Sequence, residues 1–185
     1  MNYCPERKLA FIMPTKTGTS TLEHFLSIWG TAKLDGNRHR LYKDIINSNP
    51  KLKAYTFFGF YRDPLDRFLS ICRHMYKVDK NLFYLGFPDS VYDNYVDTFY
   101  DELEKISYMA VPQVKWLQDV QLLDYRNYSQ EILKLARIFN QSKVEMKVLN
   151  STPKFQSTIS QKVIDFVQSY YADDYRLGRE RGLLK

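Results

Sequence analysis

The sequence predicts an α/β fold in one domain, residues 1–185, with a central parallel sheet flanked by helices. Short apolar runs, which are typical of buried strands, alternate along the chain with segments in which apolar residues recur at helical spacing. Such alternation favours a parallel sheet that helices cover on both faces. A length of 185 residues suits one domain, and the sequence holds no internal repeat, low-complexity tract or linker.

The first strand is expected at residues 9–13 and the second at residues 55–61, because both stretches are short and rich in apolar or aromatic residues. An amphipathic helix is expected after each strand. Apolar side chains recur at positions i, i+3, i+4 and i+7 over residues 22–29, and again over residues 65–72. The second helix also has a start signal, since an aspartate that caps a helix precedes a proline suited to the first turn (Asp63-Pro64).

Further elements of both kinds are expected along the rest of the chain. Residues 31–53 are polar, basic and weakly patterned, and we expect them to lie over the functional site, because ligands of such sheets bind beyond the carboxyl ends of strands. The other expected elements are a helix within residues 92–106, a strand at 120–125, a helix over 132–139, a strand at 146–149 and a helix over 163–170.

The composition limits the kind of protein. No apolar run approaches the roughly 20 residues of a membrane span, and residues 9–13 are too short for a signal-peptide core, so a cytoplasmic protein without a membrane partner is expected. Two cysteines and three histidines lack the spacing of a disulfide framework or a metal site, so no metal is expected. A net charge of +6 favours an anionic partner: nucleic acid, a phosphorylated cofactor or an acidic glycan.

The stretch Pro14 to Thr21, PTKTGTST, has the composition of an anion-binding loop. A turn from strand to helix presents unpaired N–H groups, and the helix dipole is positive there. Gly18 lets the backbone approach an anion closely, Lys16 adds a charge, and the hydroxyls add donors. A plain N-cap is the alternative, since Ser and Thr cap helices routinely. The GxxxxGK[ST] signature of nucleotide hydrolases is absent.

A second stretch, YRDPLDRFLS from Tyr61 to Ser70, follows the second expected strand. Arg62 ends that strand, and Ser70 lies two turns into the next helix. The two side chains are therefore expected to converge on one anion, for which the planar fork of arginine is well suited.

Together these stretches resemble the paired signature of sulfotransferases that use 3′-phosphoadenosine 5′-phosphosulfate (PAPS), above all carbohydrate sulfotransferases with P-K-T-G-[TS]-[TS] and R-[DN]-P-x-x-R-[FL]-x-S. The resemblance implies a P-loop-like sulfotransferase fold, a catalytic lysine, a first loop that holds the 5′-phosphosulfate, and an arginine and a serine that hold the 3′-phosphate. It implies the product adenosine 3′,5′-bisphosphate and no metal, because basic residues replace it. The residues implied to bind the donor are Lys16, Thr17, Gly18, Thr19, Ser20, Thr21, Arg62, Ser70 and, in the fainter STPK stretch, Lys154.

The base that accepts the acceptor's proton is expected to be His39. It lies in GNRHRLYKDI, which is similar to the H-x-x-Y-x-[DE] stretch that supplies the base histidine in some glycan sulfotransferases. Glu23 and Asp35 are the alternatives for this role, whereas His24 and His74 are expected to pack or to face solvent. The basic residues around His39 suit an acidic acceptor, although a solvated face explains them nearly as well: Lys33, Arg38, Arg40 and Lys43.

The resulting expectation is a sulfotransferase that acts on a hydroxyl-bearing acceptor, with a carbohydrate expected. A sugar, a protein tyrosine and a small alcohol would share the same donor site. Two rival hypotheses remain: a nucleotide kinase with an atypical phosphate loop, and a basic nucleic-acid-binding module. Dispersed basic residues without a nucleic-acid-binding motif count against the second, so no nucleic acid is expected as partner.

Overall fold

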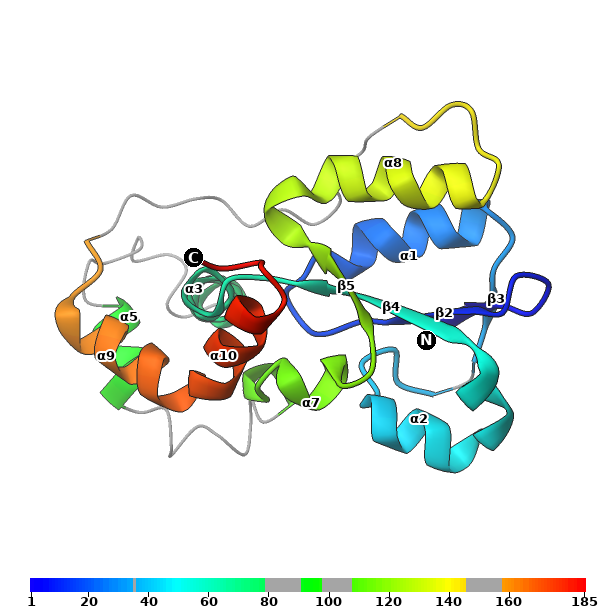
Figure 1. Cartoon of the computed structure of the whole chain (residues 1–185). Helices are drawn as coiled ribbons and strands as arrows, with labels where there is room; N and C mark the ends of the chain where they lie inside the picture. Colours follow the sequence, from blue (N-terminus) through cyan, green and yellow to red (C-terminus); the bar gives the residue numbers. More distant parts are fainter. Residues whose placement is uncertain (35, 79–90, 98–107, 146–157) are drawn as a thin grey trace.

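The computed structural model of the chain describes residues 1–34, 36–78, 91–97, 108–145 and 158–185. They form a mixed α/β fold around an open five-stranded sheet with the strand order β3-β1-β2-β4-β5 (Figure 1). The strands are β1 (Asn2–Cys4), β2 (Leu9–Ile12), β3 (Ala32–Lys33), β4 (Thr56–Tyr61) and β5 (Gln121–Asp124).

Three strands confirm the predicted parallel arrangement. β2 pairs in parallel with β4, and β4 with β5, so Phe11 lies opposite Phe58 and all three carboxyl ends meet at one edge. The prediction of a wholly parallel sheet is wrong, because β1 pairs antiparallel with both β2 and β3. These two strands have three and two residues, which is too short for a hydrophobic pattern to reveal them. The strand expected at 146–149 lies outside the described residues.

The helices expected after β2, β4 and β5 are present, as is the one near the end of the chain. Of the helix expected within 92–106, the described part is helical and 98–107 lies outside the described residues. No helix in the described ranges is long and apolar enough to cross a membrane. The helices are α1 (Thr19–Ile28), α2 (Tyr42–Ser48), α3 (Pro64–Val78), α5 (Val91–Asp97), α7 (Val114–Leu117), α8 (Tyr128–Ile138), α9 (Gln161–Tyr170) and α10 (Ala172–Glu180), with 3₁₀ turns η1 (Pro50–Ala54) and η2 (Tyr125–Asn127).

Helices cover both faces of the sheet. Along β2 the side chains alternate, so Leu9 and Phe11 pack into the core formed with α1 and α8, whereas Ala10 and Ile12 pack into the core formed with α2 and α7. A third cluster joins α3, α5 and α9 beyond the carboxyl edge of the sheet (Figure 1). Residues 31–53 thus hold a helix, α2, which packs on the sheet through its buried residues Ile45 and Ile46, and they do not only lie over the site. The seven residues of α2 are too few for a clear period.

Gly59 on β4 lets α7 lie close against the sheet. A Cβ atom at this position would lie 2.6 Å from Leu117 Cδ2, which is closer than any ordinary contact. The absence of that side chain brings α7 and the residue before it, Gln113, to the carboxyl edge of β4. The packing of α7 therefore places Gln113 at the edge of the sheet where residues 14–21 and 61–70 meet.

Candidate anion-binding site

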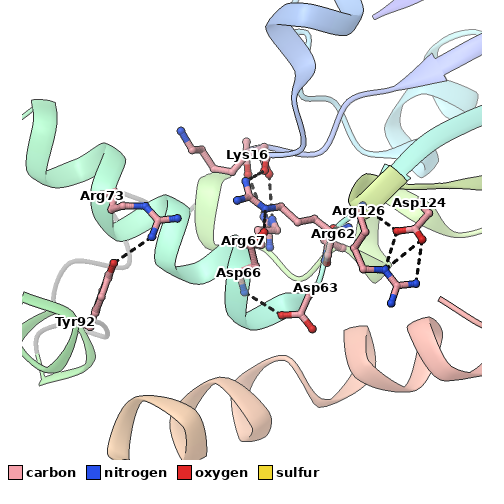
Figure 2. A network of polar contacts seen from close by, with 11 residues as sticks. Lys16, Arg62, Asp63, Asp66, Arg67, Arg73, Tyr92, Asp124 and Arg126 are labelled. Atoms are coloured by element: carbon pink, nitrogen blue, oxygen red, sulfur yellow. Dashed lines mark hydrogen bonds and ion pairs between the residues drawn. The ribbon is translucent and has the colours of Figure 1, made fainter. Parts of the chain in front are cut away.

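The two polar stretches meet at adjacent corners of the sheet. Residues 13–18 connect β2 to α1, and residues 62–63 connect β4 to α3. Because β2 and β4 are parallel neighbours, both corners lie at the same edge. Arg62 Nη1 donates to the Lys16 carbonyl at 2.7 Å and joins them directly (Figure 2).

The backbone of the first corner is left-handed at two positions. Lys16 has φ 62° and Gly18 has φ 74°. The left-handed region costs an L-residue about 1–2 kcal/mol, whereas glycine adopts it freely, so Lys16 holds a strained conformation. Gly18 is the N-cap of α1 and no side chain caps the helix. The alternative that the loop hydroxyls serve as a helix cap is therefore wrong, and Thr17 instead donates to the Pro14 carbonyl at 2.8 Å.

The first turn of α1 has three features that suit an anion: backbone N–H groups, the positive end of the helix dipole and hydroxyl side chains. The Leu22 N–H, which donates to the Gly18 carbonyl at 3.1 Å, begins the hydrogen-bond ladder of the helix. The N–H groups of Thr19 and Ser20 precede this bond and, as in any first helical turn, have no acceptor within the helix. The first turn carries no acidic side chain to offset the dipole. Thr19 and Thr21 are buried there and Ser20 is half-buried, so their hydroxyls lie at the same corner as these N–H groups.

Arg67 on α3 donates hydrogen bonds to the backbone of the loop after β2, a role that the sequence did not reveal. The side chain is fully buried on α3, where Nε donates to the Thr15 carbonyl at 3.0 Å. Its Nη2 donates to the carbonyls of Met109 and Val111 at 2.7 and 3.0 Å. The guanidinium also lies 5.4 Å from the ring centre of Trp116. The only sequence signal was its place as the second arginine of the R-D-P-x-x-R pattern.

Arg62 is held at the rim of the site by protein groups. Its Nε donates to Asp66 at 2.7 Å, and its guanidinium lies 4.5 Å from the ring centre of Tyr125. The Gln113 amide bonds both the backbone N–H and the backbone carbonyl of Arg62, at 3.0 and 2.7 Å, and so extends the pairing of β4. The expected cap of α3 is confirmed, because Asp63 accepts from the Asp66 N–H at 3.0 Å.

Ser70 lies two turns beyond Arg62 on α3. Its hydroxyl is buried and has no hydrogen-bond partner among the described residues, and no hydrogen bond joins it to Arg62. One turn further, Arg73 donates to the Tyr92 hydroxyl at 3.1 Å. Figure 2 shows the Lys16 side chain directed away from Arg62 and over α3, toward the end of the helix that carries Arg73. The basic groups of the site therefore lie on both sides of the loop.

His39 is brought to the start of the loop. Its Nδ1 lies 2.6 Å from the Met13 carbonyl, directly before Pro14, and its own carbonyl accepts from Trp116 Nε1 at 3.0 Å. Arg38 Nε donates to His39 Nε2 at 3.1 Å. Burial is the largest influence on this imidazole and lowers the pKa of His39 below its ordinary value.

The other candidate bases are placed differently. Glu23 on α1 pairs with Lys33 at 2.9 Å and with Arg38 at 3.1 Å. Burial alone would raise the pKa of Glu23, but these two hydrogen bonds outweigh it and lower the pKa. His24 is exposed and borders a cavity of about 180 Å³ together with residues after α8, and His74 is half-buried on α3. Asp35 and Lys154 lie outside the described residues.

Comparison of the chain with models of protein families, with curated proteins and with solved structures finds no match. In the described ranges, no group of three His, Cys, Asp or Glu side chains is arranged to hold a metal ion. The fold and the site define a mixed α/β protein in which two adjacent strand-to-helix corners present N–H groups, a strained lysine and arginines. An arrangement of this kind suits phosphate or sulfate groups.

Proposed function

We propose that the chain transfers the sulfuryl group of PAPS to a hydroxyl acceptor, with a carbohydrate as the expected acceptor class. The observation that carries the proposal is the 2.7 Å contact between Arg62 Nη1 and the Lys16 carbonyl. It joins the two stretches that resemble sulfotransferase signatures into one site. Either stretch alone would suit many phosphate ligands, but the donor has two separate anionic ends and requires both.

The first corner is assigned to the 5′-phosphosulfate. N–H groups and hydroxyls at the start of α1, from Thr19 to Thr21, would hold its phosphate. In the transfer, the bond from sulfur to the bridging phosphate oxygen breaks while sulfur bonds to the acceptor oxygen. Negative charge therefore develops on the departing phosphate oxygen, and we assign its stabilisation to Lys16. The strained backbone of Lys16 supports a functional role, because such strain persists where function requires it.

The 3′-phosphate is assigned to Ser70 and Arg62. A buried hydroxyl without a partner costs free energy, and a phosphate oxygen would provide that partner. Arg62 would exchange Asp66 for the phosphate, and the side chain of Asp66 is already 51% exposed. An ion pair with such an exposed partner is worth only about 0–1 kcal/mol, so the exchange favours the doubly charged phosphate.

His39 is assigned as the base. The Met13 carbonyl holds Nδ1, so Nε2 carries the lone pair that would receive the acceptor's proton once the Arg38 guanidinium, which donates to it, has moved. On this assignment, Lys16→Ala abolishes turnover without unfolding the chain, and His39→Ala lowers turnover strongly. Near-normal turnover of His39→Ala would show that His39 is not the base.

Thermal stabilisation by adenosine 3′,5′-bisphosphate, compared with 5′-AMP and without metal, tests the proposal. We expect the bisphosphate to raise the melting temperature more, and Arg62→Ala and Ser70→Ala to remove the difference. Arg176→Ala, an exposed arginine on α10, serves as the charge-matched control and should keep the difference. Equal shifts for both nucleotides would overturn the proposal. Stabilisation by ATP only with magnesium would favour a kinase, and salt-dependent binding of any DNA a nucleic-acid module.

A further inference from the structure

The pair Arg38 and His39 carries a second inference. His39 Nδ1 lies 2.6 Å from the Met13 carbonyl, and a carbonyl only accepts hydrogen bonds. Nδ1 therefore carries the proton of the neutral imidazole, and the lone pair is on Nε2. Arg38 Nε donates to that lone pair at 3.1 Å. The nitrogen that has to accept a proton is thus already occupied.

Arg38 is held in this place by a carboxylate on another element. Its Nη1 donates to Glu23 Oε2 at 3.1 Å, and Glu23 Oε1 pairs with Lys33 at 2.9 Å. Two cations thus share one carboxylate, so the group keeps an excess of positive charge. The Arg38 and Lys33 side chains are 44% and 59% exposed, and exposed ion pairs of this kind contribute little to stability. An anion from solvent can therefore draw the Arg38 guanidinium away from Glu23 and His39 at a small cost in free energy.

We propose that Arg38 masks the Nε2 lone pair of His39, and that an acceptor carrying a carboxylate or sulfate unmasks it by drawing the guanidinium to itself. The acceptor half of this inference rests on the proposed function. The masking half rests on the contacts alone. Masking would also protect the donor, because an uncovered base beside a bound donor activates water and wastes the sulfuryl group by hydrolysis.

The charged groups around the imidazole agree with this role. Burial lowers the pKa of His39, and the charges of Arg38 and the N-terminal amine of Met1 lower it further. The hydrogen bond from Nδ1 to Met13 and the charge of Glu23 act in the opposite direction. The ring of Tyr108 lies 6.4 Å from the imidazole, centre to centre. Removal of Arg38 should therefore make His39 easier to protonate.

NMR titration of the His39 ring in the full chain tests the masking. We expect Arg38→Ala to move the His39 midpoint to higher pH. Arg40→Ala is the matched control, because Arg40 flanks His39 on the other side but donates to the Asp44 carbonyl on α2, and it should leave the midpoint in place. A midpoint that moves equally in both variants, or in neither, would overturn the masking.

Glucuronate and glucose are the probes for the acceptor half. Glucuronate should shift the Nε2 resonance of wild-type His39 and raise its midpoint, as Arg38→Ala does, whereas glucose should not. Equal responses to both sugars would overturn the unmasking. With PAPS and no acceptor, Arg38→Ala should release inorganic sulfate several-fold faster than the wild type, and an unchanged rate would count against protection of the donor. The NMR titration needs no donor, so the two proposals can fail separately. If the chain did not bind the bisphosphate but Arg38→Ala still moved the His39 midpoint, the masking would stand and the proposed sulfotransferase function would be wrong.

Discussion

Arg67 Nε donates to the carbonyl of Thr15 at 3.0 Å across 52 positions of the chain. The same guanidinium satisfies two more carbonyls from residues 109–111, and it is fully buried. A single side chain thus connects the loop after β2, helix α3 and the segment before α7. The left-handed backbone of Lys16 follows directly after the carbonyl that Arg67 holds, so this arginine supports the strained part of the loop.

Replacement of Arg67 by methionine is expected to destabilise the fold. The buried carbonyl of Thr15 and the half-buried carbonyl of Val111 would lose their donor, whereas the Met109 carbonyl would keep the Thr15 hydroxyl. A buried acceptor without a partner costs about 1–3 kcal/mol, so a loss of about 2 kcal/mol or more is expected. Urea unfolding measures it. Arg176→Met, which removes an exposed arginine from α10, should change stability by no more than about 0.5 kcal/mol. A similarly small effect of Arg67→Met would show that the buried guanidinium does not support the loop.

The close approach of Tyr128 to Gly18 gives a matched pair of variants. Alanine at either Gly18 or Gly30 introduces a side chain at positive φ, 74° or 78°, at a cost of about 1–2 kcal/mol. Only at position 18 does the new Cβ meet a ring, 2.6 Å from Tyr128 Cε2, whereas it meets nothing within 4 Å at position 30. The Tyr128 ring stacks on Phe60, and its hydroxyl donates to the Gly18 carbonyl. Because both contacts hold the ring in place, it cannot move away from a new Cβ atom without losing them.

Gly18→Ala should therefore lose clearly more stability than Gly30→Ala, and only Gly18→Ala should lose bisphosphate binding. Chemical denaturation and calorimetric titration measure the two effects. Equal losses of stability would mean that the ring moves aside at no cost.

The strain at Lys16 predicts a difference between two variants that both lack the charge. Lys16→Gly should be more stable than Lys16→Ala by about 0.5–1 kcal/mol, because glycine alone adopts φ 62° without strain. Both variants should lose bisphosphate binding. Lys8, exposed in a turn with φ 50°, is the control, since the same two substitutions there should differ in stability but keep binding. If Lys16→Ala proved as stable as Lys16→Gly, no strain would be stored at this position.

Neutralisation of Asp66 is expected to improve binding. On the proposed function, Asp66 would compete with the 3′-phosphate for Arg62. Asp66→Asn should therefore tighten the affinity for adenosine 3′,5′-bisphosphate by about threefold, because an exposed ion pair contributes little. Titration calorimetry measures the change. Asp173→Asn on α10 alters the net charge equally at a distance and should have little effect. Weaker binding in Asp66→Asn would instead mean that the carboxylate orients the guanidinium for the ligand.

The lowered pKa of His39 predicts a pH-dependent stability. Above the unfolded pKa of about 6.5 both states hold a neutral imidazole, and the full stability is present. As pH falls below that value the unfolded chain binds a proton that the folded chain resists, so stability decreases toward the lower folded pKa. The wild type should thus lose more free energy of unfolding between about pH 7 and pH 5.5 than His39→Gln. Equal slopes for both would contradict the lowered pKa.

Most of the central fold could be predicted because its signals are local. Apolar runs and helical periods revealed β2, β4, β5 and the helices after them within a few residues, since these segments are long enough for the pattern to be recognised. β1, β3 and α2 were missed because they are too short for a pattern to recur. The chemistry of the loop was equally local, as Lys16, Gly18 and the hydroxyls lie within six residues.

Local sequence patterns established which polar groups lie at each corner and that both corners share one edge of a sheet. They did not establish which of the basic side chains are held by protein acceptors. The choice depends on contacts between distant segments: Arg67 with Thr15, Gln113 with Arg62, and Arg38 with Glu23. A guanidinium bonds whichever acceptors the fold places around it, and no local pattern specifies those acceptors.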